Sequence, residues 1–423
     1  MSGFQSDLTG HIRSSNGSMN GGSKTMTKRL TAQSTLGDWL KHPVGRPLFL
    51  NLLEKIDQSP SQLGSATVFP LNQLMLLSNG KITEQELEEL VYAADAGSCD
   101  DGEYPTADNG TTTSNQRNDL TLDQIQIRDP FILRDDDNSR FYLYGSTDKN
   151  VWFGRGTGFE AYTSPDLQRW EGPFTVFSPP EDFWSEGQFW APEVHKYRGS
   201  WYMFATFTAP NGYRGTQILR SGHPLDPFLP WSDGAVTRRK WQCLDGTLFI
   251  DDNNDPWIVF CHEWTQIHDG AILAQRLSED LKSTIGTPTL LFNASDAPWS
   301  KPMQGASFEG YKFPVYITDG PYLYRLKNGH LVMLWSSFGD QGYAMGIAHS
   351  DSAQITGPWT QEDNPLWPSD GGHGMIFRIR QDQLGLTIHH PNSTPDERAV
   401  IRHLSENGRT VHLQDAGFGA EPT

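Results

Sequence analysis

The sequence predicts an all-β fold, a five-bladed β-propeller preceded by a small α-helical module. Three observations carry this prediction. The chain of 423 residues contains 41 Gly, 27 Pro and 12% aromatic residues, a composition typical of short strands joined by tight turns. Beyond residue 123, five similar units follow one another, and each opens with a turn and then shows several strand-like runs. No helical periodicity separates these units, so each is expected to form one blade.

The chain before the propeller divides into three parts. Residues 1–32 are polar and rich in Ser and Gly, so we expect a disordered tail. Residues 33–95 place apolar side chains at helical spacing, and a capping sequence begins at Thr83, so we expect a small helical accessory module with a role in packing or oligomerisation. Residues 96–122 are rich in Asp, Thr and Ser and are expected to form a linker. The propeller is expected to span residues 123–423.

A polar residue lies at or near the opening turn of every repeat. In a propeller the innermost strand of each blade begins near the central axis, so equivalent residues of successive repeats converge on one cavity. One such residue alone is typical of a solvated turn, whereas five at equivalent points indicate a common site. The five residues are Asp129, Glu193, Asp245, Asp319 and His373.

Charge and cysteine content exclude several classes of function. The net charge of −18 excludes nucleic acid and an anionic membrane as partners, because both require a basic surface. A neutral carbohydrate that stacks on aromatic side chains suits this composition better. Cys99, Cys243 and Cys261 are too few for a disulfide framework and lack the spacing of a zinc site, so we expect reduced thiols.

The cellular location is predicted from segments that the sequence lacks. The first thirty residues contain no apolar run that could serve as the core of a signal peptide, and no stretch has the length of a membrane helix. We therefore expect a cytoplasmic protein. The sequence does not indicate its oligomeric state.

Four short motifs, in this order and spacing, resemble glycoside hydrolase family 43 over residues 124–405. They are Arg128-Asp129-Pro130-Phe131, Trp190-Ala191-Pro192-Glu193-Val194, Leu244-Asp245-Gly246 and Asp319-Gly320-Pro321-Tyr322. The resemblance implies inverting hydrolysis of a glycosidic bond, in which one carboxylate activates water and a protonated carboxyl group donates to the leaving oxygen. It implies no requirement for a cofactor.

The resemblance also implies a role for each aspartate. Asp129 corresponds to the general base, and Asp245 to a third carboxylate that raises the pKa of the acid and orients it. Asp319 stands where the family usually carries a glutamate as general acid. Because Asp is one methylene shorter than Glu, Glu263, Glu309 and Glu193 remain alternative proton donors.

Further residues are expected to bind the sugar or a metal ion. Trp190 and Trp264 are candidates for an aromatic platform, and Glu193, Glu263 and His373 for polar contacts with the substrate. His373 resembles the axial histidine that in many family members helps to hold a central calcium ion, so a structural calcium in the channel is implied. The alternative is a histidine that only forms hydrogen bonds with the pocket wall.

The activity expected from the resemblance is that of an α-L-arabinofuranosidase acting on plant-type pentose oligosaccharides or polysaccharides. A β-xylosidase or a β-galactosidase of the same fold is the nearest alternative. A propeller that binds carbohydrate without catalysis is a third possibility, because the residue at the position of the acid departs from the family pattern.

Overall fold

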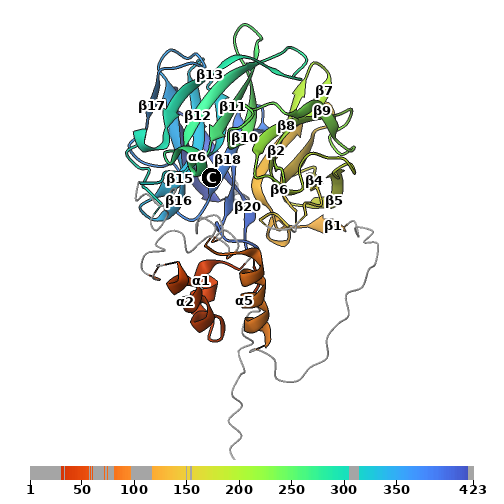
Figure 1. Ribbon diagram of the computed structural model, residues 1–423. Coiled ribbons are helices and arrows are strands. Elements are labelled where there is room, and N and C mark those ends of the chain that lie inside the picture. Colours follow the sequence, from red (N-terminus) through yellow and green to blue (C-terminus); the bar gives the residue numbers. More distant parts are fainter. Residues whose placement is uncertain are drawn as a thin grey trace, which may run out of the picture.

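The computed structural model describes two parts of the chain. These are residues 30–96, except 33, 57, 59, 61–70, 72–73 and 75–80, and residues 117–417, except 149, 153–154 and 304–313. Figure 1 shows a ring of strands with a small group of helices beside it. Nearly all of the expected tail, most of the expected linker and Cys99 lie outside the described residues. Within the described residues, no helix is long and apolar enough to cross a membrane.

The helices before the propeller form a small core of their own. They are α1 (Leu36–Lys41), α2 (Gly45–Lys55) and α5 (Glu84–Ala96). Helix α1 begins at a capping box, in which the Thr35 hydroxyl accepts from the Asp38 amide and the Asp38 carboxylate accepts from the Thr35 amide. The apolar faces of the helices surround the buried Trp39 and Phe49 in a cluster that includes no propeller residue. The helical expectation for this segment thus matches the structure.

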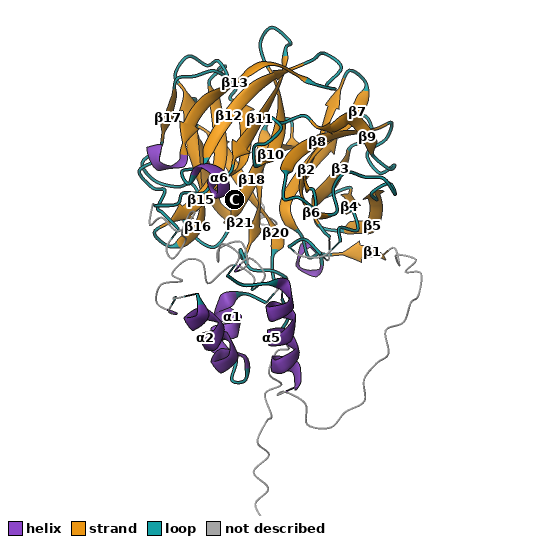
Figure 2. Cartoon of the chain, viewed as in Figure 1, coloured by secondary structure: helices purple, strands orange, loops and turns teal. Residues whose placement is uncertain are grey.

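The strands form five antiparallel sheets, which confirms the predicted five-bladed propeller (Figure 2). Blade 1 contains β1 (Arg117–Leu120), β2 (Arg128–Asp135), β3 (Arg140–Ser146), β4 (Phe159–Ser164) and β5 (Trp170–Phe177). Blade 2 contains β6 (Gly187–Tyr197), β7 (Ser200–Thr208), β8 (Arg214–Ser221) and β9 (Leu229–Ala235). Blade 3 contains β10 (Cys243–Ile250), β11 (Pro256–His262), β12 (Ala271–Leu277) and β13 (Thr284–Asn293).

The chain completes the ring with two further blades. Blade 4 contains β14 (Asp319–Arg325), β15 (Leu331–Gly339), β16 (Gly342–Ser350) and β17 (Trp359–Gln361), and blade 5 contains β18 (Gly372–Arg380), β19 (Gln383–His390), β20 (Arg398–Glu406) and β21 (Val411–Gly417). The connections include η2 (Leu122–Gln124), α6 (Trp264–Ile267) and η3 (Ala294–Asp296). The first long strand of each blade contacts those of its two neighbours, so β2, β6, β10, β14 and β18 surround the axis.

Strand β1 lies inside the segment expected to be a linker. It pairs with β5 at the edge of blade 1, and only its last residue, Leu120, is buried. A short polar edge strand shows no alternation of apolar and polar residues, so the sequence pattern does not reveal it. The propeller structure therefore begins at Arg117 instead of at residue 123.

The second strands of the blades are buried on both faces. In β7, seven successive residues from Trp201 to Phe207 are buried, because neighbouring sheets pack against both sides of the strand. This packing explains the continuous apolar runs of the repeats. Cys243 and Cys261 lie in this interior as buried free thiols, as expected.

Every innermost strand begins with the same backbone irregularity. The register shifts directly after Arg128, Trp190, Leu244, Asp319 and Gly372. The residue that follows each shift has a positive φ: Asp129 (51°), Ala191 (45°), Asp245 (54°), Gly320 (51°) and His373 (48°). Such bulges redirect side chains and are frequent next to active sites. The structurally equivalent residues of blades 2 and 4 are thus Ala191 and Gly320, not Glu193 and Asp319.

Hydrogen bonds join these positive-φ residues to the preceding blade, and we call the set the inter-blade ring. In four cases the backbone amide donates to a side chain on the second strand of that blade: Asp129 to His389 Nδ1 (3.3 Å), Ala191 to Ser146 Oγ (2.8 Å), Asp245 to Thr206 Oγ1 (2.9 Å) and His373 to Ser336 Oγ (2.8 Å). The corresponding residue of blade 3 is Cys261, which pairs with Leu244. There the Gly320 amide donates instead to Asp245 Oδ2, at 2.9 Å.

Candidate active site

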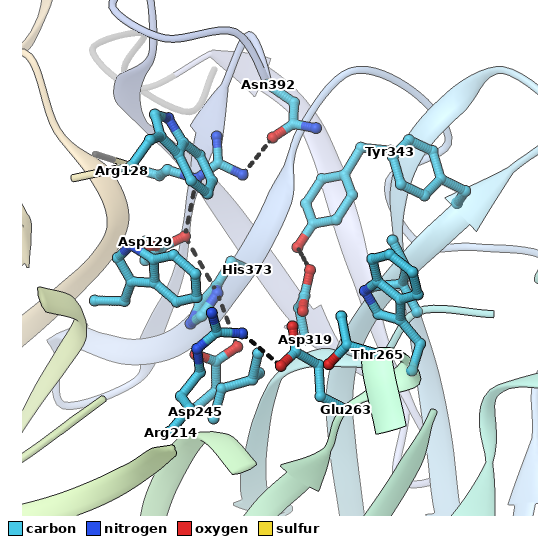
Figure 3. A pocket seen from close by; sticks show the side chains of 16 residues that line it. Arg128, Asp129, Arg214, Asp245, Glu263, Thr265, Asp319, Tyr343, His373 and Asn392 are labelled. Atoms are coloured by element: carbon cyan, nitrogen blue, oxygen red, sulfur yellow. Dashed lines mark hydrogen bonds and ion pairs between the residues drawn. The ribbon is translucent and has the colours of Figure 1, made fainter. Parts of the chain in front are cut away.

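A small pocket lies at the end of the axis where the innermost strands begin (Figure 3). Asp129 from β2, Asp245 from β10 and Asp319 from β14 line this pocket, so the structure brings together the three predicted carboxyl groups. The cavity has a volume of about 90 Å³. Its other walls include Arg128, Trp152, Trp190, Arg214, Glu263, Trp264, Tyr343, His373 and Asn392.

The surroundings of Asp129 favour an ionised carboxylate. The Ser146 hydroxyl donates to Oδ2 at 2.7 Å, and Oδ1 lies 3.2 Å from His373 Nδ1 and 3.8 Å from Arg128 Nε. Burial by itself raises the pKa of Asp129, but His373, Arg128 and the Ser146 hydrogen bond together outweigh burial and hold the pKa below its ordinary value. A carboxylate that stays ionised can accept a proton from water.

His389 holds the backbone of Asp129. Burial, followed by the charge of Arg128, lowers the pKa of His389 to about 3, so its imidazole is neutral. Its Nδ1 therefore accepts the Asp129 amide, and its Nε2–H can donate to Asn392 Oδ1 at 3.1 Å. The same Asn392 oxygen accepts from Arg128 Nη2 at 2.6 Å. This network orients both residues of the Arg128-Asp129 pair.

Asp245 interacts with residues that adjoin each of the other two aspartates. Its Oδ2 accepts from the Gly320 amide and lies 3.6 Å from His373 Nδ1. Burial, with Asp129 as the next contribution, raises the pKa of Asp245 well above its ordinary value. The hydrogen bond to Gly320 connects Asp245 to the backbone directly after Asp319, which suits the predicted role of an orienting third carboxyl group.

The surroundings of Asp319 favour a protonated carboxyl group. Burial, followed by the interaction with the nearby Asp245 carboxyl group, raises the pKa of Asp319 to about 7. The Tyr343 hydroxyl donates to its Oδ2 at 3.0 Å and fixes the side chain within the pocket. A carboxyl group that retains its proton near neutral pH is what a general acid requires.

Glu263, the main alternative acid, forms a buried ion pair. Its Oε2 contacts Arg214 Nη1, and both side chains are less than one-tenth exposed. Such a pair requires an ionised carboxylate, whereas a general acid must carry a proton. Arg214 also donates to Gln188 and Thr208, which fixes its guanidinium. Glu309, another alternative, lies outside the described residues.

The structure does not place Glu193 at the pocket. It lies two residues beyond Ala191 on β6, and its Oε2 is 3.2 Å from His195 Nε2. The residues at the same distance from the bulges of blades 1 and 4 are Phe131 and Tyr322, whose ring centroids are 6.2 Å apart. Glu193 thus belongs to the next layer of side chains along the axis. The bulge, which sequence alone does not show, accounts for the difference.

Trp190 and Trp264 both line the pocket. The Trp190 indole N–H donates to the Val151 carbonyl, and the Arg214 guanidinium carbon lies 4.4 Å from the centre of a Trp190 ring. Trp264 is the first residue of α6 and packs against a cluster that contains Phe338. Both indoles therefore have fixed positions, and a role as sugar platforms stays a prediction.

His373 lines the pocket, but its surroundings do not fit a calcium site. Its Nδ1 faces Asp129 Oδ1 and Asp245 Oδ2, and its amide donates to Ser336. In the parts of the chain that the structure describes, no three His, Cys, Asp or Glu side chains are grouped to hold a metal ion. Calcium prefers about six to eight oxygen ligands, and this arrangement does not offer them. The structure favours the alternative, a histidine that interacts with groups of the pocket wall.

Sequence reasoning did not single out Arg214, Tyr343 or Trp152 as pocket residues. Arg214 begins β8 and Tyr343 is the second residue of β16, so each stands at the start of the third strand of its blade. In an antiparallel blade this end of the third strand lies at the same face as the start of the first. Arg214 and Tyr343 could thus have been identified in the sequence. Each is a charged or aromatic residue near the start of a third strand, just after the turn that joins it to the second strand.

The comparisons with known proteins agree with this geometry. The model of glycosyl hydrolases family 43 matches residues 123–421. A solved structure described as an endo-arabinase from Bacteroides thetaiotaomicron VPI-5482 is 40% identical with a TM-score of 0.63, and the match covers 70% of this chain and 100% of that one.

Curated relatives are more distant in sequence. The extracellular exo-α-(1→5)-L-arabinofuranosidase ArbA of Cellvibrio japonicus (strain Ueda107) is 22% identical over 62% of this chain and 74% of its own length. Alpha-L-arabinofuranosidase 43 of Humicola insolens is 24% identical over 66% of this chain and 60% of its own length. Because one of these relatives is named as extracellular, the cytoplasmic location stays a prediction. The family match and the solved relative confirm the resemblance found in the sequence, and the chain belongs to glycosyl hydrolases family 43.

Proposed function

We propose that this protein is an inverting glycosidase that removes α-L-arabinofuranosyl residues from plant-type oligosaccharides or polysaccharides. The observation that carries the mechanism is the opposite pKa shift of two carboxyl groups in one pocket, lowered at Asp129 and raised to about 7 at Asp319. Asp129 takes a proton from water as the water oxygen attacks the anomeric carbon. Asp319 gives its proton to the leaving oxygen as the glycosidic bond breaks, so the configuration inverts.

Two observations support the assignment of an arabinofuranosyl residue as the sugar that is removed and its location at the end of the substrate chain. The relatives named above are an exo-α-(1→5)-L-arabinofuranosidase, an α-L-arabinofuranosidase and an endo-arabinase. The catalytic cavity of about 90 Å³ is far smaller than the roughly 300–1,000 Å³ of pockets for drug-sized ligands. Such a cavity favours binding of a single terminal sugar residue.

The test compares substrates whose leaving groups differ in acidity. In Asp319→Asn, kcat on arabino-oligosaccharides should fall by roughly 10²–10⁴-fold, because an alkoxide leaves poorly without a proton. On a dinitrophenyl α-L-arabinofuranoside the same variant should lose far less, because that leaving group needs no proton. Glu263→Gln, which breaks the ion pair with Arg214, should affect both substrates to a similar extent.

Three outcomes would contradict the proposal. If Asp319→Asn keeps most of its activity on oligosaccharides, Asp319 is not the acid. If the wild type releases sugar faster from aryl β-D-xylosides or β-D-galactosides than from the arabinofuranoside, the substrate assignment is wrong. Binding of these sugars without any turnover would indicate a carbohydrate-binding propeller.

A further inference from the structure

Two further cavities adjoin the candidate catalytic pocket in series. Trp152 lines both this pocket and a second cavity of about 270 Å³, which is also bordered by Gln188 and Thr208. Ala209 lines the second cavity and a third of about 720 Å³, which we call the outer cleft. Because neighbouring cavities share these residues, the three hollows lie next to one another along the protein surface.

The outer cleft is formed at the active-site end of the propeller. Trp184 lies directly before the first strand of blade 2, and Tyr213 lies in the turn between its second and third strands. Arg239 follows β9, the fourth strand of that blade. In an antiparallel blade these three positions lie at one end of the sheet, the end at which the innermost strands place the three aspartates. A ligand can thus extend from the pocket to the cleft on one face.

Trp184 and Tyr213 provide a fixed aromatic surface. Both are half-buried, and their ring centroids are 5.7 Å apart with an angle of 41° between the rings. The Trp184 indole N–H donates to Gln217 Oε1 at 2.7 Å, and the buried Gln217 amide donates to the Ser232 carbonyl at 2.9 Å. The orientation of the indole is therefore set before any ligand binds, which reduces the entropy cost of stacking.

The polar groups at the rim suit a ligand with many hydroxyl groups. Asn211, Asp233 and Arg239 line the outer cleft and are exposed. They offer an amide, a carboxylate and a guanidinium, so both donors and acceptors are present and neither sign of charge dominates. Aromatic faces with surrounding donors and acceptors match the apolar C–H faces and equatorial or ring hydroxyls of a neutral sugar.

We propose that the outer cleft is a second carbohydrate-binding site, which holds a distant part of the oligosaccharide whose terminal residue occupies the catalytic pocket. The identity of the sugar rests on the proposed function. One residue at a time is cleaved in the small pocket, while Trp184 and Tyr213 hold the rest of the chain. A second contact within the same ligand raises its effective concentration at the catalytic pocket without any change in the chemistry.

The kinetic test uses Trp184→Ala and Tyr213→Ala, with Trp231→Ala as matched control. Trp231 lies in β9 of the same blade, is half-buried and donates its indole N–H to the Asp280 carbonyl at 2.6 Å, but it does not line the cleft. In the two cleft variants, the ratio of kcat/KM for a long arabino-oligosaccharide to that for an aryl arabinofuranoside should fall roughly tenfold. In the control the ratio should equal that of the wild type.

A binding test separates this proposal from the proposed function. Affinity electrophoresis in gels that contain arabinan, xylan or galactan measures retention whichever bond the enzyme cleaves. Retention of the wild type and of Trp231→Ala by one of these polysaccharides, weakened in both cleft variants, supports the second site even if that polysaccharide is not arabinan. Retention that is equal in all four proteins overturns the proposal, as does an equal loss of kcat/KM on long and aryl substrates in the cleft variants.

Discussion

Asp129 and Asp319 are the same residue type in one pocket, and their surroundings shift their pKa values in opposite directions. Both are buried, which disfavours the ionised form. Around Asp129, His373 and Arg128 compensate for burial, whereas the interaction with Asp245 adds to the effect of burial at Asp319. The protonation state expected of each group therefore depends less on the aspartate itself than on the side chains that the fold places beside it.

Removal of the Tyr343 hydroxyl should move the pH profile of the enzyme. In the wild type, kcat/KM should fall on the alkaline side as Asp319 loses its proton near pH 7. The Tyr343 hydrogen bond stabilises the ionised form, so Tyr343→Phe should raise the pKa of Asp319 and shift the alkaline limb upward by up to about one pH unit. Tyr324→Phe, which removes a hydroxyl that bonds Glu406, is the control. An alkaline limb that stays in place in Tyr343→Phe would exclude Asp319 as the titrating acid.

Asp319→Asn should be more stable than the wild type at alkaline pH. The pKa of Asp319 is about 7 in the folded protein and near 3.8 in an unfolded chain. Between these values the unfolded chain releases a proton that the folded protein keeps, so the free energy of unfolding falls as the pH rises, and the full cost is present above pH 7. The Asn side chain of the variant does not ionise, so the variant does not lose this part of the free energy of unfolding as the pH rises.

Thermal unfolding at two pH values tests that expectation. The melting temperature of Asp319→Asn should exceed that of the wild type by a few degrees at pH 8 and differ little at pH 4. Asp363→Asn, which makes the same change at an exposed position beyond β17, serves as the control outside the pocket. A stabilisation of equal size at both pH values would show that the effect does not come from the ionisation of Asp319.

The candidate site could be predicted from the sequence in part. Asp129, Asp245 and Asp319 were found because each belongs to a short motif at the opening of a repeat. Arg214 and Tyr343 reach the pocket from other strands, and a contact between residues far apart in the chain leaves no local pattern. Glu193 was misplaced because a bulge of one residue changes which side chain faces the axis.

At the level of the strands, the inter-blade ring includes hydrogen bonds that stabilise the fold and also a carboxyl group of the candidate active site. Four links use a hydroxyl or an imidazole, and at the fifth the Asp245 carboxylate accepts the Gly320 amide where Cys261 offers no hydroxyl. Asp245 therefore has a structural partner as well as an electrostatic effect on Asp319. A catalytic carboxyl group thus completes a repeating backbone contact of the fold.

Ser146→Ala should affect both properties, because Ser146 accepts the Ala191 amide and donates to Asp129. Loss of the acceptor leaves a buried amide unpaired and should lower the free energy of unfolding by about 1–3 kcal/mol. Loss of the donor should raise the pKa of Asp129, so the acidic limb of kcat/KM should move to higher pH. Denaturant unfolding and a pH profile measure the two effects.

Thr206→Val is the matched control for Ser146→Ala. It removes a hydroxyl that accepts the Asp245 amide in the same ring, and that hydroxyl does not contact Asp129. It should lower stability by a similar amount and leave the acidic limb where it is. Equal shifts of the acidic limb in both variants would contradict a direct role of Ser146 on the base.

The blades were predictable because each repeats the same order of turn and apolar runs. Long second strands such as β7 and β15 are buried on both faces and appear as continuous apolar stretches. Strand β1 was missed because one buried residue among four produces no periodicity. The sequence therefore predicted the strands that are buried in the core, but it did not predict the short strand at the edge of blade 1.

The whole molecule contains two kinds of core. The helices α1, α2 and α5 share a cluster of their own, while every residue lining the catalytic pocket belongs to the propeller. A chain of residues 117–423 should therefore fold and retain kcat/KM on an aryl arabinofuranoside within about twofold of the full chain. Circular dichroism and kinetics check this. A soluble, folded fragment without activity would show that the helical module is needed for catalysis.

The ring closes where the first blade meets the last, and Asp129, the proposed general base, lies at this seam. The Asp129 amide is held by His389, and Arg128 by Asn392, although all three aspartates of the pocket precede residue 320. Translation of chains that end before and after these two residues, followed by an activity assay, would show when function appears. A nascent chain that lacks these two residues, or a chain from which a protease has removed them, would contain all three aspartates of the pocket. We expect it to be inactive. We therefore expect hydrolysis only from chains that include His389 and Asn392.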